Sequence, residues 1–224
     1  MKKAVIIAPH ADDELLSCGG TILKLMKEGW EFSWIIGTKI FLEDKCNTVD
    51  AETRSEQTKE LFKALGMHSM HQLNYPAGGL CSSHIPSIVT DISKLFQTFE
   101  PQLVFLPFPG DAHTDHNHIF QASKAACKWF RHTYVDKVVC YETLSETNFD
   151  YNPNTITFRP NCYIDISERI EKKIKLTEIY FQEFGVHPFP RSPDSLRALA
   201  QYRGCSAGYK YAEAFQILLS RSCF

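Results

Sequence analysis

Short, uninterrupted apolar segments alternate along this chain with longer segments of helical periodicity, and this alternation limits the folds that it can adopt. The apolar segments are residues 4–8, 32–36, 103–106 and 137–141, with a shorter strand pattern at 71–74. The segments of helical periodicity are residues 12–27, 51–65, 85–99 and 114–131. A strand without polar alternation is typical of a parallel sheet that is covered on both faces. We therefore predict an α/β fold: a Rossmann-like, mostly parallel sheet with helices on both faces.

The rhythm changes after residue 150. The pattern predicts short strands at 155–158 and 162–166, a long helix at 167–184, a proline-rich loop at 188–193 and two final helical stretches. We interpret this part as a C-terminal strand and helix elaboration, because no linker or internal repeat separates it from the rest. The chain of 224 residues is within the range of one domain, so we expect residues 1–224 to form a single domain.

Charge and composition exclude several classes of protein. The formal net charge is -2, and the densest basic run, Lys172, Lys173 and Lys175, lies on a predicted helix face, so we expect no nucleic-acid partner. No apolar run reaches the ~20 residues that a membrane span needs. The eight cysteines form no Cys-x-x-Cys pair, and the chain opens on a strand pattern rather than a signal peptide. We expect the cysteines to be reduced thiols and the protein to be cytoplasmic. The sequence is also compatible with a homo-oligomer.

Two polar clusters follow predicted strands. Residues 9–14 (Pro-His-Ala-Asp-Asp-Glu) come after the first strand, and residues 110–116 (Gly-Asp-Ala-His-Thr-Asp-His) come after the strand at 103–106. Parallel strands bring both clusters to the carboxyl edge of the sheet, where open α/β sheets bind ligands. Each cluster alone is compatible with a helix cap or a polar turn. Together they offer imidazoles and carboxylates at one place, which favours a Zn²⁺ site.

Such a site has a chemical consequence. Three protein ligands leave one position on the metal open for water, and the metal lowers the pKa of that water toward about 7. A further carboxylate can take the proton, and a further histidine can stabilise or protonate what leaves. A non-catalytic sugar- or nucleotide-binding module on the same scaffold is the alternative, although no Gly-x-Gly-x-x-Gly follows the first strand.

The motifs resemble those of a known family. The segment Pro9 to Glu14 is similar to the Pro-His-Pro-Asp-Asp-Glu signature of the LmbE-like (PIG-L) de-N-acetylase family, and residues 113–116 resemble its His-x-Asp-His motif. The helix that carries Arg54 and Glu56 also fits the family pattern. So does the closing segment, with Arg203-Gly204, Gly208 and Tyr-Ala-Glu-Ala-Phe at 211–215.

The resemblance implies a reaction and a role for each matching residue. His10, Asp13 and His116 match the zinc ligands, with Fe²⁺ as an alternative metal. Asp12 matches the general base, and His113 matches the histidine that stabilises the oxyanion and helps to protonate the leaving amine. Asp115 is expected to orient His113, and Arg54 to contact the sugar. The implied activity is zinc-dependent removal of acetyl from an N-acetylglucosamine-type sugar conjugate, a small-molecule substrate. Another N-acyl amide or an ester is the alternative substrate.

This sequence also departs from the family pattern. Ala11 replaces the usual proline of the first motif, and Ala77 stands where an aspartate often follows a proline. The second change predicts that a sugar-hydroxyl contact is missing or is supplied elsewhere. The sequence leaves open the roles of Glu14, His187 and the loop at 39–50, and also the identity of the sugar and its aglycone.

Overall fold

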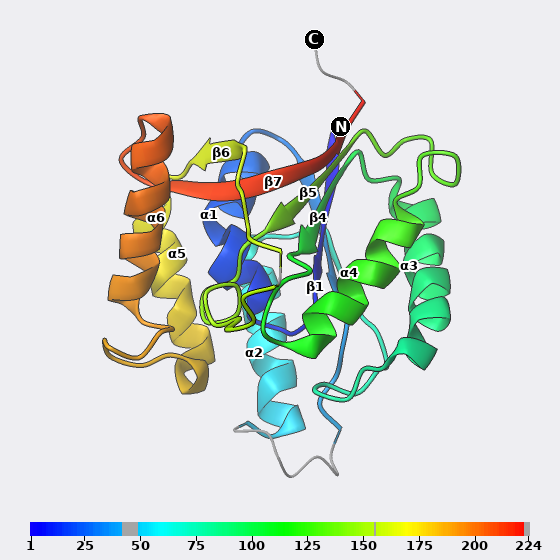
Figure 1. Ribbon diagram of the computed structural model, residues 1–224, viewed down its shortest axis with the longest axis horizontal. Helices are drawn as coiled ribbons and strands as arrows, with labels where there is room; N and C mark the ends of the chain where they lie inside the picture. The colour runs from blue at the N-terminus through cyan, green and yellow to red at the C-terminus, as the bar shows by residue number, and fades with distance from the viewer. Residues whose placement is uncertain (42–48, 155, 222–224) are drawn as a thin grey trace.

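A computed structural model describes residues 1–41, 49–154 and 156–221. A seven-stranded sheet runs through its centre, with helices on both faces (Figure 1). Most of the predicted loop at 39–50 lies outside the described residues. Within the described part, no helix has the length and apolar character needed to cross a membrane.

The elements follow one another in an alternating order through β5. The strands are β1 (Lys3–Ala8), β2 (Glu31–Ile36), β3 (Ser69–Gln72), β4 (Leu103–Pro107), β5 (Lys137–Tyr141), β6 (Cys162–Asp165) and β7 (Ala212–Ser220). The helices are α1 (Asp13–Lys27), α2 (Ala51–Leu65), α3 (Ile85–Phe99), α4 (Thr114–Ala126), α5 (Ile170–Leu176) and α6 (Pro193–Ala207). Two 3-10 segments are η1 (Ser82–His84) and η2 (Thr177–Glu183).

The sheet has the order β3-β2-β1-β4-β5-β7-β6. The first five strands pair in parallel, whereas β7 is antiparallel to both β5 and β6. The predicted mostly parallel, Rossmann-like sheet is therefore confirmed. The chain moves outward from β1 to β2 and β3 and then returns to place β4 on the other side of β1. Ligands of open α/β sheets bind at such a reversal of strand order.

Alternate residues of the central strands face two separate cores. On β1, Ala4 and Ile6 pack on the side covered by α1 and α2, whereas Val5 and Ile7 pack on the side covered by α3 and α4. All four residues are fully buried or nearly so. This double burial explains the uninterrupted apolar sequence of the strand. It also fixes the position of the loops that follow β1 and β4.

Two predicted helices are shorter than expected. The helix predicted at 114–131 ends at Ala126, because Trp129 does not join the core but lies exposed beside Phe130 and Arg221. The helix predicted at 167–184 is α-helical only over α5 and continues as η2. A kink at Tyr180 (φ -101°, ψ 42°) accompanies the full burial of its ring, with the Arg54 guanidinium 5.0 Å from the ring centre.

The end of the chain also differs from the prediction. Residues 156–158 form no strand, and residue 155 lies outside the described residues. Up to residue 221, where the described C-terminal part ends, the first of the two final helical stretches is α6, and strand β7 takes the place of the second. The reason is long-range packing: Phe215 of β7 is fully buried, with its ring 5.3 Å from that of Phe105 in β4.

Candidate metal centre and active site

The loop after β1 is tightly held at the point where α1 begins. Asp12 has a φ of 153°, which a residue with a side chain rarely adopts and which costs on the order of 1–3 kcal/mol. Its N–H donates to Glu14 Oε2 at 3.1 Å, and its carbonyl accepts from the N–H groups of Leu15 and Leu16. Glu14 is fully buried, and burial raises the pKa of its carboxyl well above the usual range. Glu14 therefore supports the strained loop.

Two histidines and an aspartate bring donor atoms together beside this loop. His10, Asp13 and His116 each offer one such atom, and these three atoms lie within 4.8 Å of one another. Asp13 Oδ2 lies 3.5 Å from His10 Nδ1 and 3.3 Å from His116 Nε2. His10 and Asp13 come from the loop and helix start after β1, whereas His116 lies in the first turn of α4. The fold therefore brings the three predicted metal ligands together.

The environment of His116 tests whether this cluster suits a metal ion. Its Nδ1 donates to Asp111 Oδ2 at 2.8 Å, and Thr147 Oγ1 donates to the other oxygen of Asp111 at 2.6 Å. Its Nε2 is buried and lies 3.3 Å from Asp13 Oδ2, but it makes no well-aligned hydrogen bond to any described residue. An unpaired buried polar atom costs about 1–3 kcal/mol. A ring held through one nitrogen, with the other nitrogen facing two further donor atoms, is typical of a histidine metal ligand, so the residues fit.

A second group of donors competes for this assignment. His10, His113 and Asp115 also have ligand atoms within 4.8 Å of one another. However, the carboxylate of Asp115 already accepts hydrogen bonds from His10 Nε2 at 3.0 Å, from the Gly78 N–H at 2.7 Å and from the Leu80 N–H at 3.1 Å. Those contacts occupy three of the about four lone-pair sites of the carboxylate, so little of it is left for a metal ion. The group that contains His116 is therefore the better metal site.

Asp115 was predicted to orient His113, but its carboxylate bonds to His10 instead. Its carboxylate orients His10, and it touches His113 only through its backbone N–H, which donates to His113 Nδ1 at 3.1 Å. The reason is local: His113 is the N-cap of α4 and Asp115 lies in its first turn, so the cap geometry joins backbone to ring. Because Nδ1 accepts this bond, the proton of the neutral ring is on Nε2.

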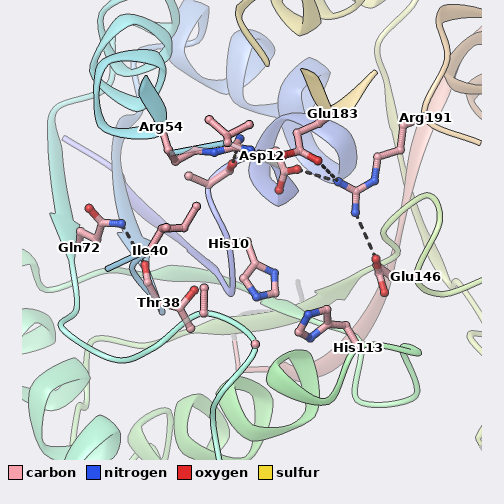
Figure 2. A pocket seen from close by; sticks show the side chains of 14 residues that line it. His10, Asp12, Thr38, Ile40, Arg54, Gln72, His113, Glu146, Glu183 and Arg191 are labelled. Carbon is pink, nitrogen blue, oxygen red and sulfur yellow. Dashed lines mark hydrogen bonds and ion pairs between the residues drawn. The ribbon is translucent and has the colours of Figure 1, made fainter. Parts of the chain in front are cut away.

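Asp12 and His113 line a pocket of about 200 Å³ next to the donor cluster (Figure 2). Burial raises the pKa of Asp12 to about 6, with the positive charge of Arg191 opposing the rise. Burial, together with the neighbouring His10 and His116, lowers the pKa of His113 to about 4. The His10 and His113 rings meet edge to face, with their centres 4.5 Å apart.

Arg54 also lines the pocket, but much of its guanidinium is already engaged. It donates to the Ala11 carbonyl at 3.0 Å and pairs with Glu183. Arg54 therefore braces the loop after β1 as well as facing the pocket. Ala77, at the departure from the family pattern, lies in the pocket wall next to Gly78.

Sequence reasoning missed several residues of the site. Asp111 lies in the polar cluster 110–116, two residues before the second motif, so its proximity to His116 was a usable signal. Glu146, Glu183 and Arg191 line the pocket from distant parts of the chain, and no motif marks them. His187 is exposed and is not part of the pocket lining, although its loop does reach the site through Arg191.

The sheet order and the donor cluster define a class: a Rossmann-like α/β protein with a candidate metal centre where the strand order reverses. Within that class, the chain belongs to the PIG-L family. The sequence profile of this family, described as GlcNAc-PI de-N-acetylase, matches residues 5–127, more than half of the chain. The family predicted from the two motifs is thus confirmed, and both motifs lie inside the matched residues.

Individual relatives resemble the chain over nearly its whole length. Diacetylchitobiose deacetylase of Thermococcus kodakarensis is 25% identical over 234 residues, covering 97% of this chain and 84% of that protein. The crystal structure of the conserved protein TT1542 from Thermus thermophilus has a TM-score of 0.79 at 25% identity, covering 100% and 97% of the two chains. N,N'-diacetylchitobiose deacetylase from Pyrococcus horikoshii has a TM-score of 0.77 at 24% identity, covering 97% and 84%, and shows the shared fold.

Proposed function

We propose that this PIG-L family protein is a metal-dependent N-deacetylase that hydrolyses the acetamido group of an N-acetylated sugar. The observation that carries the proposal is one juxtaposition. A largely buried donor set, with an imidazole nitrogen that makes no hydrogen bond to the described residues, adjoins a pocket into which a carboxylate and a histidine project. The name of the Thermococcus relative, a deacetylase of an acetylated sugar, supports the same reaction class.

His10, Asp13 and His116 are the residues that would hold the metal. When bound, a divalent metal polarises the amide carbonyl and lowers the pKa of a water molecule. A mixed imidazole and carboxylate set suits Zn²⁺, and Fe²⁺ is the alternative that this donor set also accepts.

Asp12 and His113 carry out the proton transfer and the hydrogen bonding that the reaction needs. Asp12 accepts the proton of the attacking water, because it is the pocket carboxylate that immediately precedes a proposed metal ligand. His113 donates a hydrogen bond from Nε2–H to the carbonyl oxygen as negative charge develops there. The proton held by Asp12 then passes to the nitrogen as the C–N bond breaks. Acetic acid and a free amine leave, which balances the addition of one water molecule, and in solution they ionise to acetate and the protonated amine.

The dimensions and polarity of the pocket favour a single sugar ring at the site. The pocket measures about 200 Å³, and Arg54, Gln72 and Glu146 provide polar groups in its wall. We retain Arg54 as a sugar contact, alongside its role in bracing the loop. With Ala77 in the wall, the hydroxyl that an aspartate would bind must find another partner.

A substrate panel tests the proposal. Protein reconstituted with Zn²⁺ or Fe²⁺ is offered N-acetylated sugars, N-acetyl amino acids and acetate esters, and released acetate and free amine are quantified. Hydrolysis of N-acetylated sugars is expected, with an identically prepared Asp12→Asn variant as the control. Turnover restricted to amino acids or esters would support the alternative hydrolase. Purified protein that binds no divalent metal and hydrolyses nothing would favour a binding module.

We further propose that residues 1–224 act as one catalytic domain in a reducing compartment, the cytoplasm. Strands β6 and β7 complete the sheet that β1 begins, and Arg191 reaches the pocket from the C-terminal third. The six cysteines among the described residues are free thiols, which supports a reducing environment.

A further inference from the structure

Arg191 joins the C-terminal part of the chain to the proposed general base. It lies in the loop between η2 and α6, and its Nη1 donates to Asp12 Oδ2 at 2.8 Å (Figure 2). The same guanidinium donates from Nη2 to Glu146 Oε1 at 3.1 Å and from Nε to Ser145 Oγ at 2.7 Å. The three acceptors come from the loops after β1 and β5. Arg191 therefore ties together three segments that are far apart in the sequence.

This arginine is held from both sides of its own backbone. Its carbonyl accepts from the Gly185 N–H at 3.0 Å, and the next residue, Ser192, caps α6 through a bond from the Ser195 N–H. The side chain is 17% exposed. A planar guanidinium with several fixed acceptors gives its partner a defined orientation as well as a charge.

The partner is a residue that needs such support. Asp12 has a strained backbone, and the Glu14 carboxylate accepts a hydrogen bond from the Asp12 N–H. That bond fixes the backbone of Asp12 but does not orient its carboxylate. Strained residues at functional sites persist where the surroundings over-determine their conformation. Arg191 constrains the side chain of Asp12, because it donates a hydrogen bond to one oxygen of the Asp12 carboxylate.

We propose that Arg191 is a positioning residue that fixes the Asp12 carboxylate through Oδ2 and so presents Oδ1 to the attacking water. The inference rests on the proposed function. It goes beyond the family match, because Arg191 lies outside the residues that the family profile covers. Two other roles remain as outcomes of the test: a purely structural tie for the loop, and a clamp that must open before Asp12 can act.

The test compares Arg191→Ala and Arg191→Lys with the wild type, using the N-acetylated sugar identified by the substrate panel. We expect the alanine variant to lose about 10- to 100-fold in kcat, as for lost supporting contacts around a site, with KM and bound metal nearly unchanged. Lysine cannot reproduce the forked contacts and should restore only a small part of the activity. Added guanidinium, well below denaturing concentrations, should restore part of the kcat of Arg191→Ala but none in Asp12→Asn.

Arg203→Ala is the matched control. The Arg203 side chain has the same exposed fraction of 17% and also pairs with a glutamate, Glu142, but it makes no contact with Asp12. Its kcat should remain near that of the wild type.

Four results would overturn the inference. Equal losses in Arg191→Ala and Arg203→Ala, or a loss that follows bound metal and melting temperature, would mean a structural tie. A rise in kcat in Arg191→Ala would mean a clamp. A wild-type protein that releases no acetate would contradict the proposed function itself, and this inference with it.

Discussion

At the scale of single residues, the two nitrogens of His116 have opposite environments. Nδ1 bonds to Asp111, whereas Nε2 is buried without a hydrogen-bond partner in the described part of the chain. Asp111 is itself held by Thr147. This arrangement makes Asp111 a supporting residue for the proposed metal ligand.

The Asp111 arrangement predicts the effect of Asp111→Asn. An asparagine can keep both contacts, with its Oδ1 accepting from His116 Nδ1–H and its amide donating to Thr147 Oγ1, but it removes the negative charge that makes the His116 ring more basic. We expect metal affinity to fall about 10- to 100-fold while the protein stays folded, measured by competition with a chromogenic chelator. Asp165→Asn is the control, because Asp165 bonds to Ser167 at a distance from the site. Unchanged affinity in Asp111→Asn would contradict the assigned contact.

Asp12 and the metal ligands have different proposed roles, so substitutions at Asp12 and His116 should have different effects. Asp12→Ala should retain metal and lose on the order of 100-fold or more in kcat, because it removes the group that accepts the proton. His116→Ala should lose both metal and activity. Metal content by elemental analysis and acetate release by coupled assay separate the two. An Asp12→Ala variant with full activity would refute the general-base role.

At the scale of elements, α1 is fastened to the C-terminal part of the chain along one side. A Cβ on Gly20 would lie 2.8 Å from Ile166, so this glycine marks a close approach of the two segments. Glu213 of β7 accepts the N–H groups of Gly20 and Thr21, and Lys173 of α5 donates to Glu213 and to the Leu16 carbonyl. Helix α1, which begins beside the proposed metal ligands, is thus held by a buried ion pair.

Breaking this pair should destabilise the protein strongly. Lys173→Met leaves the Glu213 carboxylate buried without its cation, and removal of one partner of a buried pair typically costs about 3–5 kcal/mol. Chemical denaturation of Lys173→Met measures the loss in the free energy of unfolding. Lys172→Met is the control, since Lys172 is exposed and should change stability by less than about 0.5 kcal/mol. Equal stability of the two variants would contradict the role of the pair.

At the scale of the whole molecule, the proposed metal links two halves of the sheet. Its ligands lie after β1 and at the start of α4, which follows β4, so a bound ion would join segments about 100 residues apart in the chain. Any ligand that binds only the folded state stabilises it by mass action. Binding of the metal should therefore increase the free energy of unfolding of the whole protein.

Metal removal should lower the melting temperature. At a metal concentration ~1,000 times Kd the stabilisation is about 4 kcal/mol, which corresponds to roughly 8–16 °C for a chain of this size. Thermal unfolding followed by circular dichroism after chelation, and again after Zn²⁺ is restored, measures the shift. His116→Ala should show no response to Zn²⁺. A shift of the same size in that variant would mean that the ion acts elsewhere.

The sequence by itself determined the parallel half of the fold and the two clusters of imidazole and carboxylate groups that form the proposed metal site. The apolar segments of β1, β2, β4 and β5 are buried on both faces, so their composition carries the signal locally. The two motifs follow directly from strands whose carboxyl ends must share an edge. That constraint is sufficient to place His10, Asp13 and His116 together.

Only the tertiary structure decided the rest. Strand β7 and the kink at Tyr180 depend on packing against distant elements, which local periodicity does not encode. Asp115 orients His10 rather than His113, and Arg191 reaches Asp12 across 179 positions of sequence. The physical reason is the same in each case. The local sequence pattern determines the secondary structure of a segment. The hydrogen-bond partner of a side chain depends instead on which distant segment the packing of the core brings close to it.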